Sequence, residues 1–133
     1  MRTLLLSLLL LPFICNSATK TKLEESNHIY LNQAFKPATV AGVMEEALRK
    51  DSELEEGKPI YLVLYSPCGS IVAGRELINF LKGLGRDVHT ISLFATSMGF
   101  HTAQSLGKRY SLPNGTLMTH KARGGLVESF LDS

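Results

Sequence analysis

Short apolar runs alternate along this chain with longer segments in which apolar residues recur every three or four positions. The runs are rich in β-branched and aromatic residues and predict strands at His28–Leu31, Pro59–Tyr65, Val88–Phe94 and Thr116–His120. Pro59–Tyr65 is nearly continuous in apolar residues, which is typical of a parallel strand covered on both faces.

The segments between these runs have the apolar spacing of amphipathic helices. The first helix begins near Pro37, a residue that suits a first helical turn. Its apolar stripe is Val40, Val43, Met44, Ala47 and Leu48, and its outward residues are Glu45, Glu46, Arg49 and Lys50. The next helices are Ile71–Leu84, with Ile71, Leu77, Ile78 and Leu81 as its stripe, and Met98–Lys108. We expect a solvated charged loop at Asp51–Lys58 and a turn at Pro113–Asn114–Gly115.

Strands that alternate with helices of this length predict a single α/β domain built from βαβ units with a mostly parallel sheet. Ligands of such sheets bind beyond the carboxyl ends of the strands. Gly69, Ser97 and His120 all fall at or just past predicted strand ends. We therefore expect these residues to lie at the same edge of the sheet.

The first residues have the pattern of a secretory signal peptide rather than of the fold. Met1–Arg2 is positive, Leu4–Ile14 is apolar but short for a membrane span, and small residues follow. We predict a signal peptide over residues 1–18 and a folded domain over residues 19–133, with export to the periplasm or the exterior. An uncleaved anchor and a lipoprotein anchor at Cys15 are the alternatives.

Composition changes this picture little. The chain has 133 residues and a formal net charge of +2, with no basic patch interleaved with aromatic residues, so nucleic acid is not an expected partner. Cleavage would leave Cys68 as the only cysteine, which we expect to be buried or half-buried. No pair of histidines has metal-ligand spacing, and we interpret His28, His89 and His101 as surface or packing residues.

The strand-to-helix turn at Ser97 is the centre of the candidate chemistry. A serine held there exposes its hydroxyl over the positive end of a helix, a geometry used by nucleophilic serines, although serine is also an ordinary helix cap. The Gly69 turn and His120 would add oxyanion donors and a base. A strand-end histidine that simply binds a backbone carbonyl is the alternative for His120.

Three motifs resemble, in the same order and at compatible spacing, those of the Clp protease proteolytic subunit (ClpP) family. They are Ser66–Pro67–Cys68–Gly69–Ser70, Ala95–Thr96–Ser97–Met98–Gly99, and Leu112–Pro113–Asn114 followed by Met118–Thr119–His120. The family motifs read Ser-Pro-Gly-Gly-Ser, Ala-Ser-Met-Gly, and Leu-Pro-Asn followed by Met-Ile-His-Gln-Pro. The resemblance extends from about His28 to Gly125.

This resemblance implies a ClpP/crotonase-like fold of stacked ββα units and a serine endopeptidase that needs no cofactor. Ser97 would form an acyl-enzyme with His120 as the general base, and the N–H groups of Gly69 and Met98 would bind the oxyanion. We assign Gly124 and Gly125 to substrate binding. The family also implies a homo-oligomeric ring that acts on peptides or unfolded polypeptides. An exported member would lack ATP and therefore the AAA+ unfoldase with which family members usually work.

The sequence departs from the family pattern at Cys68, which replaces the first glycine of the turn, and at Lys121–Ala122, which replace Gln-Pro. The third triad residue of the family, usually Asp, comes well after the histidine, and no residue of this chain matches it. We therefore expect a C-terminally incomplete member. Two alternatives stay open: an inactive ring-forming or peptide-binding module, and a Ser-Lys peptidase of the signal peptide peptidase A or NfeD-like type.

Overall fold

Four parallel strands form one sheet in the order β1-β2-β3-β4, in a computed structural model that describes residues 21–121. The strands are β1 His28–Leu31, β2 Ile60–Ser66, β3 Val88–Thr96 and β4 Arg109–Met118. The predicted α/β class with a parallel sheet is confirmed. The predicted signal peptide and the proposed substrate residues Gly124 and Gly125 lie outside the described residues.

One helix follows each of the first three strands: α1 Pro37–Glu53, α2 Ile71–Gly83 and α3 Met98–Ser105. Pro37 begins α1 as predicted, and the Ser70 hydroxyl caps α2 by accepting from the Ala73 N–H at 3.3 Å. The predicted loop at Asp51–Lys58 is too long, since α1 continues through Glu53. No helix within residues 21–121 has the length and hydropathy needed to cross a membrane.

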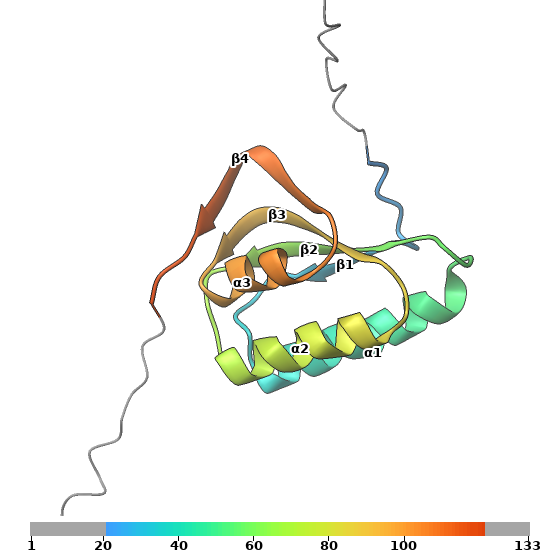
Figure 1. The fold of residues 1–133 in the computed structure, drawn as a ribbon, viewed down its shortest axis with the longest axis horizontal. Helices are drawn as coiled ribbons and strands as arrows, with labels where there is room; N and C mark the ends of the chain where they lie inside the picture. Colours follow the sequence, from blue (N-terminus) through green and yellow to red (C-terminus); the bar gives the residue numbers. More distant parts are fainter. Residues whose placement is uncertain (1–20, 122–133) are drawn as a thin grey trace, which may run out of the picture.

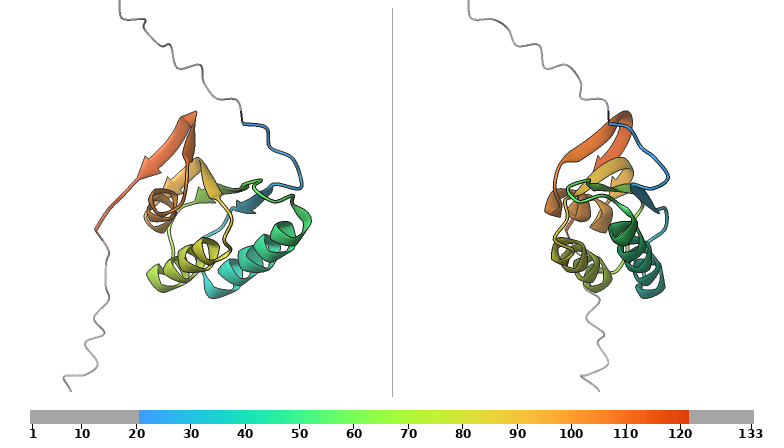
Figure 2. Two further views of the ribbon diagram at one scale, coloured as in Figure 1. Left: turned by 45° about the vertical axis from the view of Figure 1, so that its right-hand side comes forward. Right: turned by 90° about the vertical axis from the view of Figure 1, so that its right-hand side faces the viewer.

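The three helices lie on one face of the sheet (Figures 1 and 2). Leu62 and Leu64 of β2 point into the layer between sheet and helices and are buried, whereas Tyr65 is 55% exposed. Val63, on the same face as Tyr65, is also buried, so the expectation that this strand is covered on both faces is confirmed up to Val63 and wrong at Tyr65. Each strand lies next to its sequence neighbour, so every connecting helix returns over the same face.

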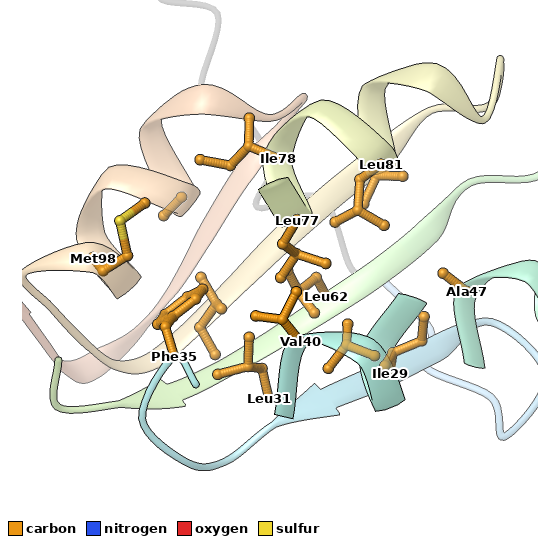
Figure 3. Close-up of a cluster of buried hydrophobic side chains, with 14 of the residues drawn as sticks. Ile29, Leu31, Phe35, Val40, Ala47, Leu62, Leu77, Ile78, Leu81 and Met98 are labelled. Carbon is orange, nitrogen blue, oxygen red and sulfur yellow. The ribbon is translucent and has the colours of Figure 1, made fainter. Parts of the chain in front are cut away.

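Side chains of β1, β2 and the helices form a continuous apolar core (Figure 3). Phe35, which precedes α1, and Leu77 of α2 are fully buried in it, and Met98 joins it from the start of α3. Gly74 lets α2 and α3 approach closely, because a Cβ there would lie 2.4 Å from the Met98 side chain. The core thus extends up to the start of α3.

Two residues of α1 are placed differently from the prediction. Leu48 is 53% exposed, and Lys50 is buried although we expected it to face outward. The Lys50 ammonium donates to the Glu25 carbonyl and lies 3.8 Å from the Glu46 carboxylate. The segment before β1 covers this side of α1 and supplies the partner that a buried ammonium needs.

The last strand also differs from the prediction. One strand, β4, begins at Arg109 and replaces the expected turn and strand, so that it contains Pro113–Asn114–Gly115. These residues lie in an irregularity of the ladder, where Ser92 pairs with Ser111 but Phe94 pairs with Thr116. The extra residues bulge from β4, and the pairing with β3 resumes beyond them and continues to Met118.

Candidate active site

The candidate residues gather at the carboxyl ends of β2, β3 and β4. The Ser66–Ser70 turn follows β2, Ser97 follows β3, and His120 lies two residues after β4. The Thr96 hydroxyl donates to the Pro67 carbonyl, which ties the end of β3 to the turn after β2. The sequence-based expectation that these segments share one edge is confirmed.

Ser97 has an unusual backbone conformation. Its φ of 54° and ψ of −113° make it the one non-glycine residue with positive φ among residues 21–121. The Ser97 N–H donates to the Met118 carbonyl at 2.9 Å, and the Ser97 carbonyl accepts from His101 N–H at 3.0 Å. Such a conformation costs about 1–3 kcal/mol and persists only where surrounding contacts enforce it. Here the end of β4 and the first turn of α3 enforce it.

Gly69 is required by the turn after β2. The Phe35 N–H donates to the Cys68 carbonyl at 3.0 Å, and the Ser70 N–H donates to the Phe35 carbonyl at 2.8 Å. Gly69 lies between these two bonds with φ of 153°, and a Cβ there would lie 2.3 Å from the Phe35 nitrogen. No acceptor for the Gly69 N–H occurs within the described chain. This N–H is therefore free to bind a ligand.

Met98 supplies a second free N–H, because it is the first residue of α3 and the first amides of a helix have no intrahelical acceptor. Gly99 allows α3 to begin close to β2, since a Cβ at Gly99 would lie 3.2 Å from the Ser66 carbonyl. The two amides proposed as oxyanion donors thus lie on segments fixed by backbone contacts.

A pocket of about 220 Å³ opens beside Ser97. The residues that line it are Ile71, Arg75, Ser97, Met98, His101, Thr119 and His120. No hydrogen bond joins Ser97 to His120 within residues 21–121; the His120 Nδ1 lies 2.8 Å from the Lys121 carbonyl instead. With Nδ1 as the donor in this contact, Nε2 has the lone pair that a base needs.

Sequence reasoning missed two residues of this pocket. His101 was interpreted as a surface or packing residue, and Arg75 was not singled out, yet both line the pocket. Ile71, predicted as part of the apolar core stripe of α2, is 45% exposed and also lines it. The available signal was helical spacing, since His101 follows Ser97 by four residues and Arg75 follows Ile71 by four.

Cys68 is exposed, so the expectation of a buried or half-buried residue is wrong. Its carbonyl accepts from the Phe35 N–H, and the residue does not line the Ser97 pocket. A thiol at this position therefore leaves the turn intact.

Other parts of the described surface offer less chemistry. A cavity of about 580 Å³ lies near the start of β2, where its walls include Lys22, Glu24 and Tyr61. Burial raises the pKa of the Tyr61 phenol, and Lys22 lowers the pKa of Glu24 through a hydrogen bond and its charge. Within residues 21–121, no three His, Cys, Asp or Glu side chains gather as metal ligands would.

Comparison with known proteins shows one family. A family model described as Clp protease matches residues 16–132. A protein of Prochlorococcus marinus (strain MIT 9313), "ATP-dependent Clp protease proteolytic subunit 2", is 36% identical over 108 residues, which cover 79% of this chain and 54% of that protein. Its counterpart in strain NATL2A is 33% identical over 111 residues, or 81% of this chain and 55% of that protein.

The structural comparison agrees. The crystal structure of the ClpP protease catalytic domain from Plasmodium falciparum superposes with a TM-score of 0.65 at 30% identity, covering 71% of this chain and 55% of that chain. The chain thus spans about half the length of the curated relatives it matches.

Proposed function

This chain belongs to the Clp protease family, and we propose that it is a serine endopeptidase that hydrolyses peptides or unfolded polypeptides through an acyl-enzyme on Ser97. The conformation of Ser97 carries the proposal. A strained serine after a strand, at the start of a helix and beside a histidine-lined pocket, is the arrangement that a nucleophile requires.

In this mechanism, Nε2 of His120 takes the Ser97 hydroxyl proton while Oγ bonds to the substrate carbonyl carbon. The N–H groups of Gly69 and Met98 bind the oxyanion, and each such donor is worth about 10²–10³ in rate. The C–N bond then breaks, and His120 returns the proton to the leaving amine. A water molecule, deprotonated by His120, then bonds to the acyl carbon, the bond from this carbon to Ser97 Oγ breaks, and His120 returns the proton to Oγ. The Lys121 carbonyl orients His120 through Nδ1.

The same residues favour one alternative, an inactive peptide-binding module. His120 is exposed and has no hydrogen bond to Ser97 in the described chain, and no acidic side chain lines the pocket. The Ser-Lys alternative has less support, because the described residues that line the pocket include no lysine.

Assembly and location are part of the proposal. The predicted signal peptide leads us to propose an exported protein, and the family leads us to propose a homo-oligomeric ring. The relatives carry "ATP-dependent" in their names. An exported chain has no ATP supply, so we propose that it acts on small or already unfolded substrates without an unfoldase.

Labelling with a fluorophosphonate serine probe tests the nucleophile. We expect labelling of the folded chain, none of Ser97→Ala, and a rate reduced by orders of magnitude in His120→Ala. Ser105→Ala at the end of α3 is the matched control and should label normally. A folded chain that binds peptide without being labelled would support the inactive module instead.

A further inference from the structure

The pocket beside Ser97 has an uneven distribution of charge. Among the described residues 21–121, the ionisable side chains that line it are Arg75, His101 and His120, and none of them is a carboxylate. The remaining walls include the apolar side chains of Ile71 and Met98. The described part of the pocket therefore combines the positive charge of Arg75 with hydrogen-bonding imidazoles and apolar side chains.

Arg75 is available to bind a ligand. It is exposed and forms no ion pair or hydrogen bond with another residue in the range 21–121. By contrast, Arg49 and Arg86 each pair with a carboxylate. A guanidinium remains charged at every physiological pH, and its fork matches the two oxygens of a carboxylate.

His101 lines the same pocket as Arg75 and comes from a different helix. It follows Ser97 by one turn of α3, while Arg75 follows Ile71 by one turn of α2. An imidazole donates at least one N–H in either protonation state. The two helices thus bring two donors to the pocket that contains the candidate nucleophile.

We propose that Arg75 and His101 select substrates with an aspartate or glutamate side chain next to the bond that Ser97 attacks. The pocket volume of about 220 Å³ is below the roughly 300–1,000 Å³ of sites for drug-sized ligands, so it suits one side chain. Ile71 and Met98 would contact the methylene groups, and Arg75 would bind the carboxylate. The inference that the acidic substrate side chain lies next to the cleaved bond rests on the proposed function. The binding of an acidic side chain in this pocket does not depend on it.

A binding measurement tests this without catalysis. Two fluorescent peptides that differ only by glutamate or glutamine would be titrated against full-length Ser97→Ala by anisotropy. We expect the glutamate peptide to bind about tenfold more tightly, the effect of a partly solvated charge-assisted hydrogen bond. Arg75→Gln in the Ser97→Ala chain should abolish the difference, and His101→Gln should reduce it.

Arg49→Gln is the matched control, because it removes the same charge from the exposed surface of α1 and should leave the preference unchanged. Equal affinity for the two peptides, binding of neither, or a preference that survives Arg75→Gln would each overturn the inference. The failure of the proposed function has a different signature: no fluorophosphonate labelling of Ser97 and no cleavage of either peptide by the unmodified chain, whatever the binding result.

Discussion

Replacing Ser97 by glycine should stabilise the protein while it removes the candidate nucleophile. Ser97 occupies φ 54° and ψ −113°, where a Cβ is strained and glycine is not. The strain amounts to about 1–3 kcal/mol, and the extra freedom of glycine in the unfolded chain offsets up to about 1 kcal/mol of the gain. The free energy of unfolding should therefore rise by about 1 kcal/mol, which raises the Tm by roughly 5 °C in a domain of this size.

Two variants separate strain from the loss of the hydroxyl. Ser97→Ala keeps the Cβ and so should keep the strain, with a Tm close to that of the unmodified chain. Ser52 lies near the end of α1, so Ser52→Gly should lower the free energy of unfolding by about 0.5–1 kcal/mol, as a serine-to-glycine change does where there is no strain to relieve. Thermal unfolding followed by far-UV circular dichroism gives all three values. If Ser97→Gly melts at or below the temperature of Ser97→Ala, the backbone strain at this residue does not exist in solution.

Further predictions concern the turn and a buried phenol. Gly69→Ala should lower the free energy of unfolding, measured by urea titration, by about 2 kcal/mol or more and abolish probe labelling, since its Cβ would overlap Phe35. Gly42→Ala in α1, where a Cβ meets nothing within 4 Å, should instead raise the free energy of unfolding by up to about 1 kcal/mol in the same titration. Because burial raises the pKa of Tyr61, its contribution to stability is intact below the ordinary tyrosine pKa and is lost as pH rises through the folded-state value. Tyr61→Phe should flatten the alkaline decline of the unfolding midpoint, and an unchanged slope would contradict this.

Much of the fold follows from the sequence because apolar residues recur along strands and along helices with different periods. β1 was predicted at its observed bounds, and Pro37 correctly marked the start of α1. The errors occur where tertiary contacts override the local pattern. Lys50 is buried because Glu25, far away in the sequence, supplies a carbonyl as its hydrogen-bond acceptor. The predicted turn lies within β4 because β3 pairs with β4 on both sides of the bulge.

The candidate site also combines features that the sequence predicts with features that only tertiary contacts determine. The motifs identified the segments that meet at the sheet edge, since strand ends follow from topology. Helical spacing places His101 near Ser97 and Arg75 near Ile71, but it does not show that these helix faces border a pocket, and the two residues were therefore missed. Cys68 was misplaced because the bond from Phe35 to its carbonyl, which fixes the turn, joins residues 33 positions apart.

The parts of the proposed machinery differ in how firmly they are held. Ser97 donates a hydrogen bond to the Met118 carbonyl, and the turn at Gly69 is fixed by hydrogen bonds with Phe35 and Thr96, all within the described residues. His120 has only the adjacent Lys121 carbonyl as a polar partner there, and it is exposed. Preorganised donors retain their effect without a base, whereas an unoriented base loses about 10⁴ in turnover. We therefore expect substitutions next to His120 to reduce the rate of probe labelling more than substitutions of residues that pack against Ser97.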